Sequence, residues 1–518
     1  MLRPEATDDF EVSWDDPAHA EQSWRWDEMH SPRPMVPVAQ DLNAALTVQT
    51  FGSELAIVNG YPFAGQMTRL PAPERSERDG RTAAQIWYEL YEPRTRELLE
   101  GLRQRDYAAM STQTLAGSLD GLLEQYGLAQ RYTMVPVFML VGEANQFIEF
   151  CEQHFGDEGE TLAATMLQGV ANESAEAGEG LAALAATAAQ SAELAAAIRD
   201  GRYDAIERCA GGQQFMAAFR DYLDAYGWRA ESWGDLDRPT WAEDPAVPLG
   251  LIARYLASPE TSPRVGYERA ARRRAEAIRD ARERLEGNVL RARFDELLAI
   301  TESYVPVREG RAFFQLALAG VMRIPLLELG RRFVASGDLG EPDDALFLYV
   351  EELQALAAGT LDEAKALVAG RRAEFAHQQT LKPPSYVGVE PPPMPPGMRM
   401  FSPDPPAEPL PERTLQGVGA SPGVVTGRAR VIATLEEAGR LEQGDVLVCR
   451  STAAPWTPLF AVAGAVVTNT GGILSHSAIV AREYAIPCVV GTRDATEKIE
   501  DGAMVTVDGG SGIVTIER

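Results

Sequence analysis

The stretch TGGILSHSAIVAREY, from Thr470 to Tyr484, decides the fold of the carboxyl-terminal part of this chain. It follows the apolar run Gly464–Thr468, which predicts a buried strand, and its residues from Ser477 onward have helical spacing. Ser475 is suited to cap that helix, so we expect His476 in the first helical turn. Free backbone N–H groups and the positive end of the helix dipole gather there, and both favour a bound phosphoryl group.

His476 is therefore our candidate for a histidine that is itself phosphorylated during turnover. The helix N-terminus favours a neutral imidazole, whose free ring nitrogen can attack phosphorus. We predict that the surrounding loop supports the phosphate through Thr470, Gly471, Gly472, Ser475 and Ser477. The alternative is a first-turn histidine that only caps or packs.

The segment resembles the phosphohistidine motif of the enzymes related to phosphoenolpyruvate synthase, pyruvate phosphate dikinase and rifampin phosphotransferase. The resemblance begins at Gly417–Gly423, continues through Ile486–Thr492 and ends in Asp501–Gly512. It implies a compact β/α swivelling domain that carries a phosphoryl group on His476. The region has neither a Walker motif nor a dinucleotide fingerprint, so we do not expect this domain to bind nucleotide itself.

Length and charge limit the classes of partner. A chain of 518 residues predicts two to four domains, and a net charge of −28 argues against nucleic acid and anionic membranes as partners. Four scattered cysteines are typical of free thiols in a reducing compartment. We see no signal peptide and no apolar stretch as long as a membrane span, so we expect a cytoplasmic protein.

The chain divides by composition into three parts. Residues 1–381 are expected to form a mainly helical substrate-binding domain, residues 382–413 a proline-rich linker, and residues 414–518 the swivelling domain, with short β-type runs between turns. The linker is either an extended tether or a strap packed on a domain surface. Residues 162–167, 180–198 and 267–285 predict helices, residues 134–140 fit helix or strand, and residues 1–45 look irregular.

The helical part resembles the substrate domain of rifampin phosphotransferase at Tyr226–Arg229, Asp235–Asp244 and Trp24–Pro34, although Trp228 departs from the family pattern. The resemblance implies that this domain binds the molecule that accepts phosphate. The guanidinium group of arginine can bind two phosphate oxygens at once. A carboxylate or an imidazole can accept the proton of a hydroxyl group. Tryptophan side chains are suited to contact a flat acceptor molecule. Our candidates for the acceptor site are His30, Trp26, Arg229, Trp241, Arg308, Glu309, Arg311 and Arg323. The alternative is that Arg308 and Glu309 form a pair on a helix surface and that the tryptophans fill a core.

Nothing in the sequence resembles an ATP-grasp domain or the pyruvate-handling barrel of phosphoenolpyruvate synthase. The layout is similar to that of two-component phenylphosphate synthase, which implies a separate ATP-grasp-type subunit that binds ATP and Mg²⁺. We expect this chain to bind no metal and no cofactor stably, and to pass phosphate from His476 to a small hydroxyl acceptor, most simply a phenol. The alternatives are a subunit of an antibiotic (rifamycin-like) phosphotransferase and a non-catalytic phosphocarrier or regulatory protein.

Overall fold

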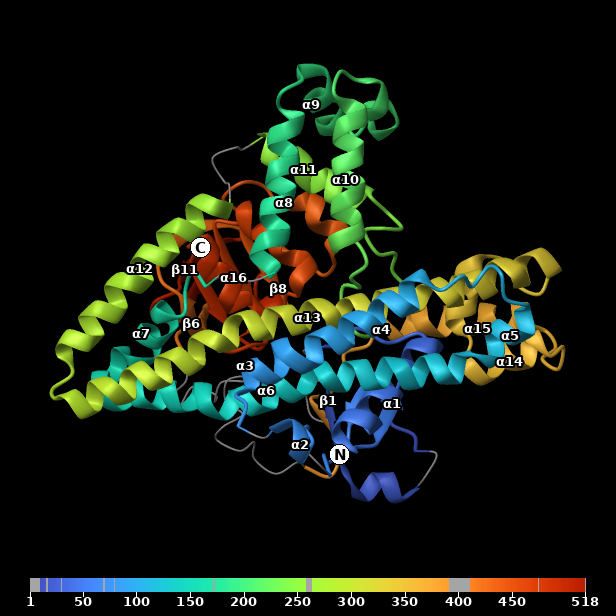
Figure 1. Cartoon of the computed structure of the whole chain (residues 1–518), viewed down its shortest axis with the longest axis horizontal. Coiled ribbons are helices and arrows are strands. Elements are labelled where there is room, and N and C mark those ends of the chain that lie inside the picture. The colour runs from blue at the N-terminus through green and yellow to red at the C-terminus, as the bar shows by residue number, and fades with distance from the viewer. Residues whose placement is uncertain are drawn as a thin grey trace. The chain divides into compact units, whose positions relative to one another are not determined.

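The computed structural model describes residues 10–14, 17–28, 30–68, 70–78, 80–170, 173–257, 263–390, 410–473 and 475–517 (Figure 1). Its contacts divide the chain into two compact units. Unit 1 takes residues 1–138, 228–240 and 314–393, and unit 2 takes residues 139–227, 241–313 and 394–518. The sequence division at residues 381 and 413 stays a prediction, since packing groups the chain differently.

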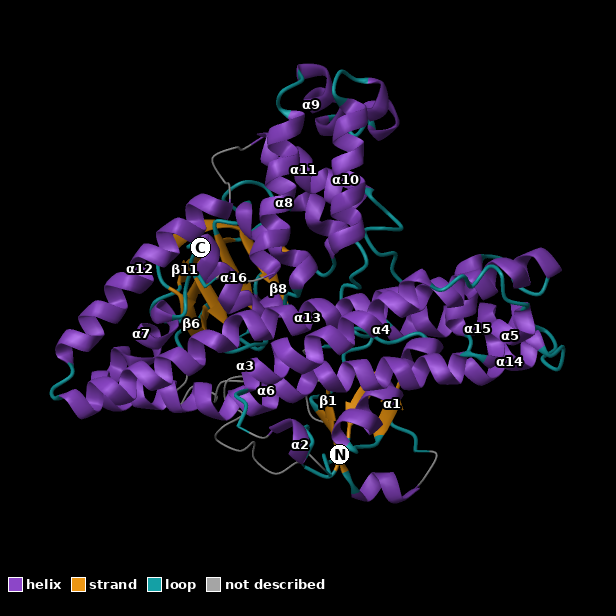
Figure 2. Cartoon of the chain, viewed as in Figure 1, coloured by secondary structure: helices purple, strands orange, loops and turns teal. Residues whose placement is uncertain are grey.

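Unit 1 consists of helices and a small antiparallel sheet (Figure 2). The sheet has the order β2-β3-β1-β4, from strands Leu55–Val58, Tyr61–Ala64, Ser23–Trp26 and Tyr386–Gly388. The helices of this unit are α1 (Pro37–Phe51), α2 (Arg75–Arg78), α3 (Ala83–Ile86), α4 (Glu92–Gln104), α5 (Thr112–Gly117), α14 (Val350–Ala357) and α15 (Ala364–Gln378). Two longer helices, α6 (Leu119–Phe155) and α13 (Asn288–Ser336), contribute residues to both units.

The amino-terminal part is more regular than its sequence indicates. Residues 1–45 look irregular, yet α1 begins at Pro37, where the ring fixes a helical φ and no N–H is needed. Trp24 is fully buried in β1, and its Nε1 donates to the carbonyl of His19 at 2.9 Å. Long-range pairing across the sheet supplies the order that local composition does not show.

The proline-rich segment is partly a strand. β4 lies within the expected linker and pairs with β1, with Trp24 opposite Val387. Residues 385–390 contain no proline, so their backbone is able to donate to a neighbouring strand. This part of the segment matches the strap alternative, whereas the denser prolines at residues 391–409 lie outside the described residues.

Unit 2 combines helices with a mixed sheet of order β5-β12-β11-β7-β8-β9-β10-β6 (Figure 2). Its strands are Thr414–Gln416, Ile513–Ile516, Met504–Asp508, Val424–Val431, Val446–Cys449, Ala465–Thr468, Cys488–Val490 and Val418–Ser421. Its helices are α7 (Gly159–Met166), α8 (Glu173–Ala188), α9 (Ala192–Arg199), α10 (Gly212–Tyr226), α11 (Ala246–Ala257), α12 (Pro263–Arg284), α16 (His476–Tyr484) and α17 (Ala495–Lys498). The expected mainly helical part followed by a β/α domain is confirmed.

The helical predictions hold with two refinements. Residues 180–198 form two helices, because Ser191 caps α9 by accepting from the N–H of Leu194 at 3.3 Å. The ambiguous residues 134–140 are helical within α6 despite Pro136. Among the described residues, α13 is long and apolar enough to cross a membrane, which corrects the expectation that no stretch has that length. However, 72% of its most apolar window is buried, as in the core helix of a folded protein.

The central strands of the sheet position the helix that begins with His476. Strands β7, β8, β9 and β10 are parallel neighbours, and β8, β9 and β10 are buried on both faces, as parallel strands usually are. The sheet separates two apolar cores, and alternate residues of β8 pack into each of them. Val446 and Val448 belong to the first core, and Leu447 and Cys449 belong to the second core. α16 contributes Ala478, Val480 and other side chains to this second core. The residues from Thr414 to Glu517 are called the β-rich domain below.

Candidate active site

His476 occupies the predicted position. β9 ends at Thr468, and α16 begins at His476 after a glycine-containing loop. Ser475 is the N-cap, with extended backbone angles, and its Oγ accepts from the N–H of Ala478 at 3.3 Å. The local prediction of strand, loop, cap and helix is therefore confirmed.

The loop is held by bonds on both sides of the histidine. Gly471 has a φ of 111°, and a Cβ on it would lie 2.9 Å from the Oγ of Ser475, so no side chain fits there. The carbonyl of Gly472 accepts from the N–H of Ser475 at 2.8 Å. Thr470 donates to the carbonyl of Arg450 at 3.2 Å, and Ser477 shares a 2.8 Å bond with Thr452. In this structure, the five predicted loop residues therefore fix the shape of the loop, and phosphate binding by them stays a prediction.

Arg482 fastens the loop to the helix. It is fully buried on α16, and its Nη1 donates to the carbonyl of Ile473 at 2.7 Å and to that of Ala420 at 3.0 Å. Burial lowers the pKa of Arg482 to about 10, so the side chain is still charged at neutral pH. The loop, β6 and α16 are thereby joined through one guanidinium.

The imidazole of His476 has two polar neighbours. Its Nδ1 lies 2.8 Å from Oε2 of Glu309, and its Nε2 lies 3.4 Å from Oγ1 of Thr457. His476 is 6% exposed and Glu309 is 0% exposed. Because a carboxylate only accepts hydrogen bonds, this geometry favours the tautomer with its proton on Nδ1 and a lone pair on Nε2. Nε2 is then the atom placed to act as nucleophile.

Positive charge gathers around Glu309 on α13. Arg308 contacts Oε1 of Glu309 through Nη1, while Oε2 faces His476. Tyr304, Arg308 and Arg311 follow one another at helical spacing and so share one side of α13. Burial and the charge of Arg308 lower the pKa of Arg311 to about 10, which leaves it cationic at neutral pH. Since Glu309 is fully buried, the alternative of an exposed Arg308–Glu309 pair does not describe this structure.

The other predicted acceptor residues have contacts of their own. In unit 1, His30 stacks on Trp233 at 3.9 Å between ring centroids, and its Nδ1 lies 2.8 Å from Asp27. Trp26 donates from Nε1 to the carbonyl of Ser31 at 3.1 Å.

Two arginines and a tryptophan from the same prediction are buried. Arg323 is 3% exposed and donates to the carbonyl of Leu236, and Arg229 is 4% exposed. Both belong to unit 1, whereas Trp241 lies in the second core of unit 2. The structure thus brings Glu309 to His476, while roles in acceptor binding for His30, Trp26, Arg229, Trp241 and Arg323 stay predictions.

Thr457 and Thr452 are site residues that sequence reasoning missed. Both belong to an apolar stretch, and their hydroxyls reach His476 and Ser477 only through the fold. The one local signal is a polar residue between Trp456 and Pro458. For metals, no group of three or more His, Cys, Asp or Glu side chains able to hold an ion occurs in the described part of the chain.

Comparisons with known proteins agree with this geometry. Residues 133–309 match the sequence profile of the fourth domain of rifampicin phosphotransferase, and residues 441–512 match that of the mobile domain of PEP-utilising enzymes. The matched ranges contain Glu309 and His476, respectively. The predicted resemblance to rifampicin phosphotransferase-like enzymes with a mobile phosphohistidine domain is thus confirmed at the level of these two regions.

Curated proteins are similar over longer stretches. The chain is 27% identical to chondramide synthase cmdD of Chondromyces crocatus over 98% of this chain and 14% of that protein. It is 29% identical to rifampicin phosphotransferase of Bacillus subtilis over 62% of this chain and 36% of the relative. It is 33% identical to the prodigiosin synthesizing transferase PigC of Serratia marcescens over 59% of this chain and 34% of the relative. The chain spans at most 36% of the length of these three relatives.

Proposed function

We propose that this chain is a phosphotransferase component that takes a phosphoryl group on Nε2 of His476 and passes it to the hydroxyl of a small acceptor. The observation that carries the proposal is the 2.8 Å contact between Nδ1 of His476 and the buried carboxylate of Glu309. It leaves Nε2 with the lone pair at a helix N-terminus, where a phosphoryl group is also well placed.

In the first step the lone pair of Nε2 attacks the β-phosphorus of ATP, and the bond from that phosphorus to the oxygen of AMP breaks. Water then cleaves the β–γ bond, so that one phosphoryl group stays on Nε2. We propose that an ATP-grasp-type partner subunit holds the ATP and Mg²⁺ and delivers the β-phosphoryl group, with release of AMP and inorganic phosphate. The β-rich domain then brings the phosphorylated imidazole to the helices of unit 2.

In the second step the acceptor oxygen attacks phosphorus, the P–N bond breaks, and the electron pair returns to Nε2. Glu309 keeps the proton on Nδ1 and stabilises positive charge on the ring, so imidazole departs as a neutral leaving group. Arg308 and Arg311 are cationic neighbours on α13 suited to balance charge on the transferred oxygens. Both oxygens of Glu309 already have partners, so the hydroxyl proton of the acceptor passes to water.

The acceptor that we propose is a phenol. The similarity in layout to phenylphosphate synthase supports it, and an aromatic side chain such as that of Trp241, in the same unit as His476, suits a flat ring. The similarity to rifampicin phosphotransferase favours a second candidate, a bulky antibiotic hydroxyl. The two are separated by offering phenols and rifamycins to the phosphorylated chain and measuring which one removes the label.

The central experiment follows phosphorus on His476. The chain is incubated with ATP labelled in the β-phosphoryl group and a cognate ATP-grasp-type protein, and the acid-labile label is measured. We expect His476→Gln, which keeps a polar side chain of similar reach, to abolish labelling completely. Retained labelling, or label found on a different side chain by mass spectrometry, would reject the proposal.

A further inference from the structure

Arg254 on α11 bonds directly to the β-rich domain. Its Nη1 donates to the carbonyl of Leu441 at 2.6 Å, and its Nη2 donates to the carbonyl of Ala438 at 2.5 Å. Ala438 lies in the last part of the 3-10 turn Leu435–Arg440, and Leu441 follows the turn directly. The carbonyl of Ala438 also accepts from the N–H of Leu441 at 3.2 Å. One side chain of the helical region therefore binds two main-chain atoms of the domain that carries His476.

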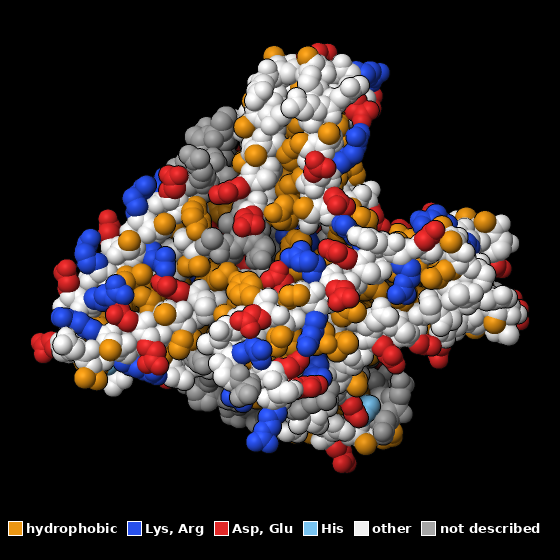
Figure 3. Space-filling model, in the orientation of Figure 1, with side chains coloured by type: hydrophobic (Ala, Val, Ile, Leu, Met, Phe, Trp, Pro, Cys, Tyr) orange, Lys and Arg blue, Asp and Glu red, His pale blue; other side chains and the backbone are white. Residues whose placement is uncertain are grey.

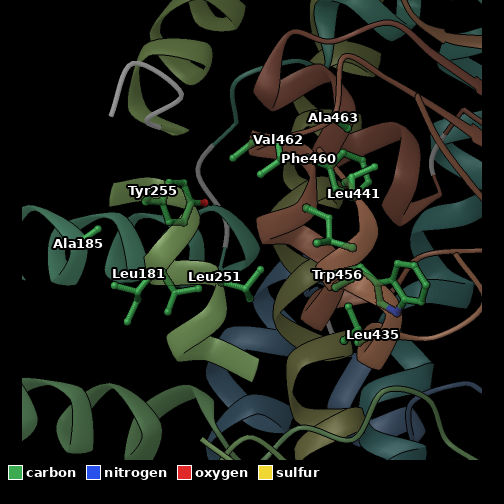
Figure 4. Close-up of a cluster of buried hydrophobic side chains, with 14 of the residues drawn as sticks. Leu181, Ala185, Leu251, Tyr255, Leu435, Leu441, Trp456, Phe460, Val462 and Ala463 are labelled. Atoms are coloured by element: carbon green, nitrogen blue, oxygen red, sulfur yellow. The ribbon is translucent and has the colours of Figure 1, made fainter. Parts of the chain in front are cut away.

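An apolar contact surrounds this arginine. Side chains of α8 and α11 pack in one cluster with side chains of the β-rich domain, as Figure 4 shows for Leu181, Ala185, Leu251 and Tyr255 on one side and Leu435, Leu441, Trp456 and Phe460 on the other. Apolar contact is non-directional and tolerates sliding. The two bonds of Arg254 are directional, so they fix one position of the domain on the helices.

A second, separate contact sits at the other end of α16. A Cβ on Gly266 of α12 would lie 3.0 Å from the carbonyl oxygen of Tyr484 and 3.1 Å from that of Glu483. α12 therefore approaches the last turn of α16 closely because residue 266 lacks a side chain. The helix that begins with His476 is thus held near its end by α12, while the 3-10 turn of the same domain is held by α11.

We propose that Arg254 is a positioning residue that holds the β-rich domain where His476 faces Glu309, the position from which the phosphoryl group is discharged. This inference rests on the proposed function, in which the domain leaves to be charged at the ATP site of a partner and then returns. Leaving breaks the two hydrogen bonds of Arg254, the contact of His476 with Glu309, the close approach of α12 to α16 and the apolar contact, and returning restores them. The strength of these contacts sets the fraction of time spent in the discharge position.

The first test measures docking without phosphate. Arg254→Met keeps an apolar stem of similar length and removes both donors. In the full chain, we expect amide hydrogen exchange at residues 435–441 and in α16 to become about tenfold faster, while β8 and β9 exchange as before. The matched control is Arg332→Met, which removes an arginine that donates to the carbonyls of Met110 and Tyr107 within unit 1. Unchanged exchange in Arg254→Met would overturn the inference.

The second test measures discharge. When His476 carries the label, Arg254→Met should transfer phosphate to the acceptor about tenfold more slowly than wild type. The rate at which the partner charges His476 should be unchanged or faster. Arg254→Lys should recover part of the lost discharge rate because it restores one donor. A variant that acts only through general instability would lower both rates together, and that result would also overturn the inference.

Two comparisons keep this inference separate from the proposed function. If the wild-type chain takes no label but exchange responds to Arg254→Met as expected, the proposed function fails and the docking contact stands. If label is gained and discharged at equal rates in both proteins, the proposed function stands and the role of Arg254 fails. Gly266→Ala tests the same position independently and should also slow discharge, so failure of one variant to fold does not end the test.

Discussion

The carboxylate of Glu309 touches two partners at once, which makes it the most sensitive single residue near His476. In Glu309→Gln the side chain keeps its size but loses the charge that faces Nδ1 and Arg308. We expect discharge of label from His476 to slow about 10²-fold, the usual scale for losing one positioned acid–base partner, while gain of label at the partner, away from Glu309, stays unchanged. Nitrogen NMR of the imidazole should show a smaller population of the tautomer with its proton on Nδ1.

Glu302→Gln is the matched control for that change. Glu302 pairs with Arg274 on the same unit but has no contact with His476 among the described hydrogen bonds. It should leave the discharge of label unchanged. Wild-type rates in Glu309→Gln would place Glu309 outside the transfer machinery.

At this scale the sequence predicted the position of His476, its cap and its loop, but neither of the two polar contacts of its ring. The cap, the loop and His476 follow one another in the chain, so local rules find them. Glu309 was a candidate because it lies beside arginines, but its distance of 2.8 Å from Nδ1 depends on residues 167 positions apart. Thr457 was missed because only the fold brings its hydroxyl to the ring.

Among the elements, a carboxylate of α1 lies at the start of α14 in an unusual environment. Asp41 of α1 accepts from the N–H of Val350 at 2.8 Å. Burial raises the pKa of Asp41 from 3.8 to about 6, with smaller increases from the nearby acids Glu351 and Glu352. The folded protein therefore binds the proton more tightly than the unfolded chain does.

The sign of the pH effect follows from that shift. Because the folded-state pKa is raised, the contribution of Asp41 to the free energy of unfolding falls as pH rises from about 4 to about 6. Asp41→Asn cannot ionise, so it should gain stability relative to wild type by about 1–2 kcal/mol across this window, after allowance for screening by solvent. Urea unfolding at pH 4.5 and pH 7.5 measures this, and a difference that does not change with pH would contradict it.

The elements also show where local patterns mislead. The β-type runs of the β-rich domain were predicted because they alternate with glycine and aspartate turns. β1 and β4 were not, because both are short strands and their pairing with each other joins residues more than 300 positions apart. The break at Ser191 was missed because alanine-rich sequence continues on both sides, and a single serine decides where α9 begins.

For the whole molecule the dominant quantity is its net charge of −28. Figure 3 shows acidic and basic side chains interspersed on one face, so no face-wide basic patch offsets the excess of acid there. Self-repulsion of this size destabilises the compact state, and salt screens it. We expect the thermal unfolding midpoint at pH 7.5 to rise by a few degrees between 10 and 150 mM NaCl, roughly the effect of 1 kcal/mol.

The same titration near the sequence pI of about 4.7 is the control. Net charge is close to zero there, so the midpoint should barely respond to salt. An equal rise at both pH values would show that salt acts by a route other than charge screening.

The overall class, helices followed by a β/α domain, could be predicted because composition changes sharply after residue 413. The two units could not, because α6 and α13 contribute to both, and no sequence signal marks where a continuous helix changes its packing partners.

The near-complete burial of His476 affects how easily water reaches the ring nitrogens. A ring that is 6% exposed offers bulk solvent almost no approach to an atom bonded to it. Under the proposed function, a phosphoryl group bonded to Nε2 would be shielded from hydrolysis by water while the β-rich domain stays in this position.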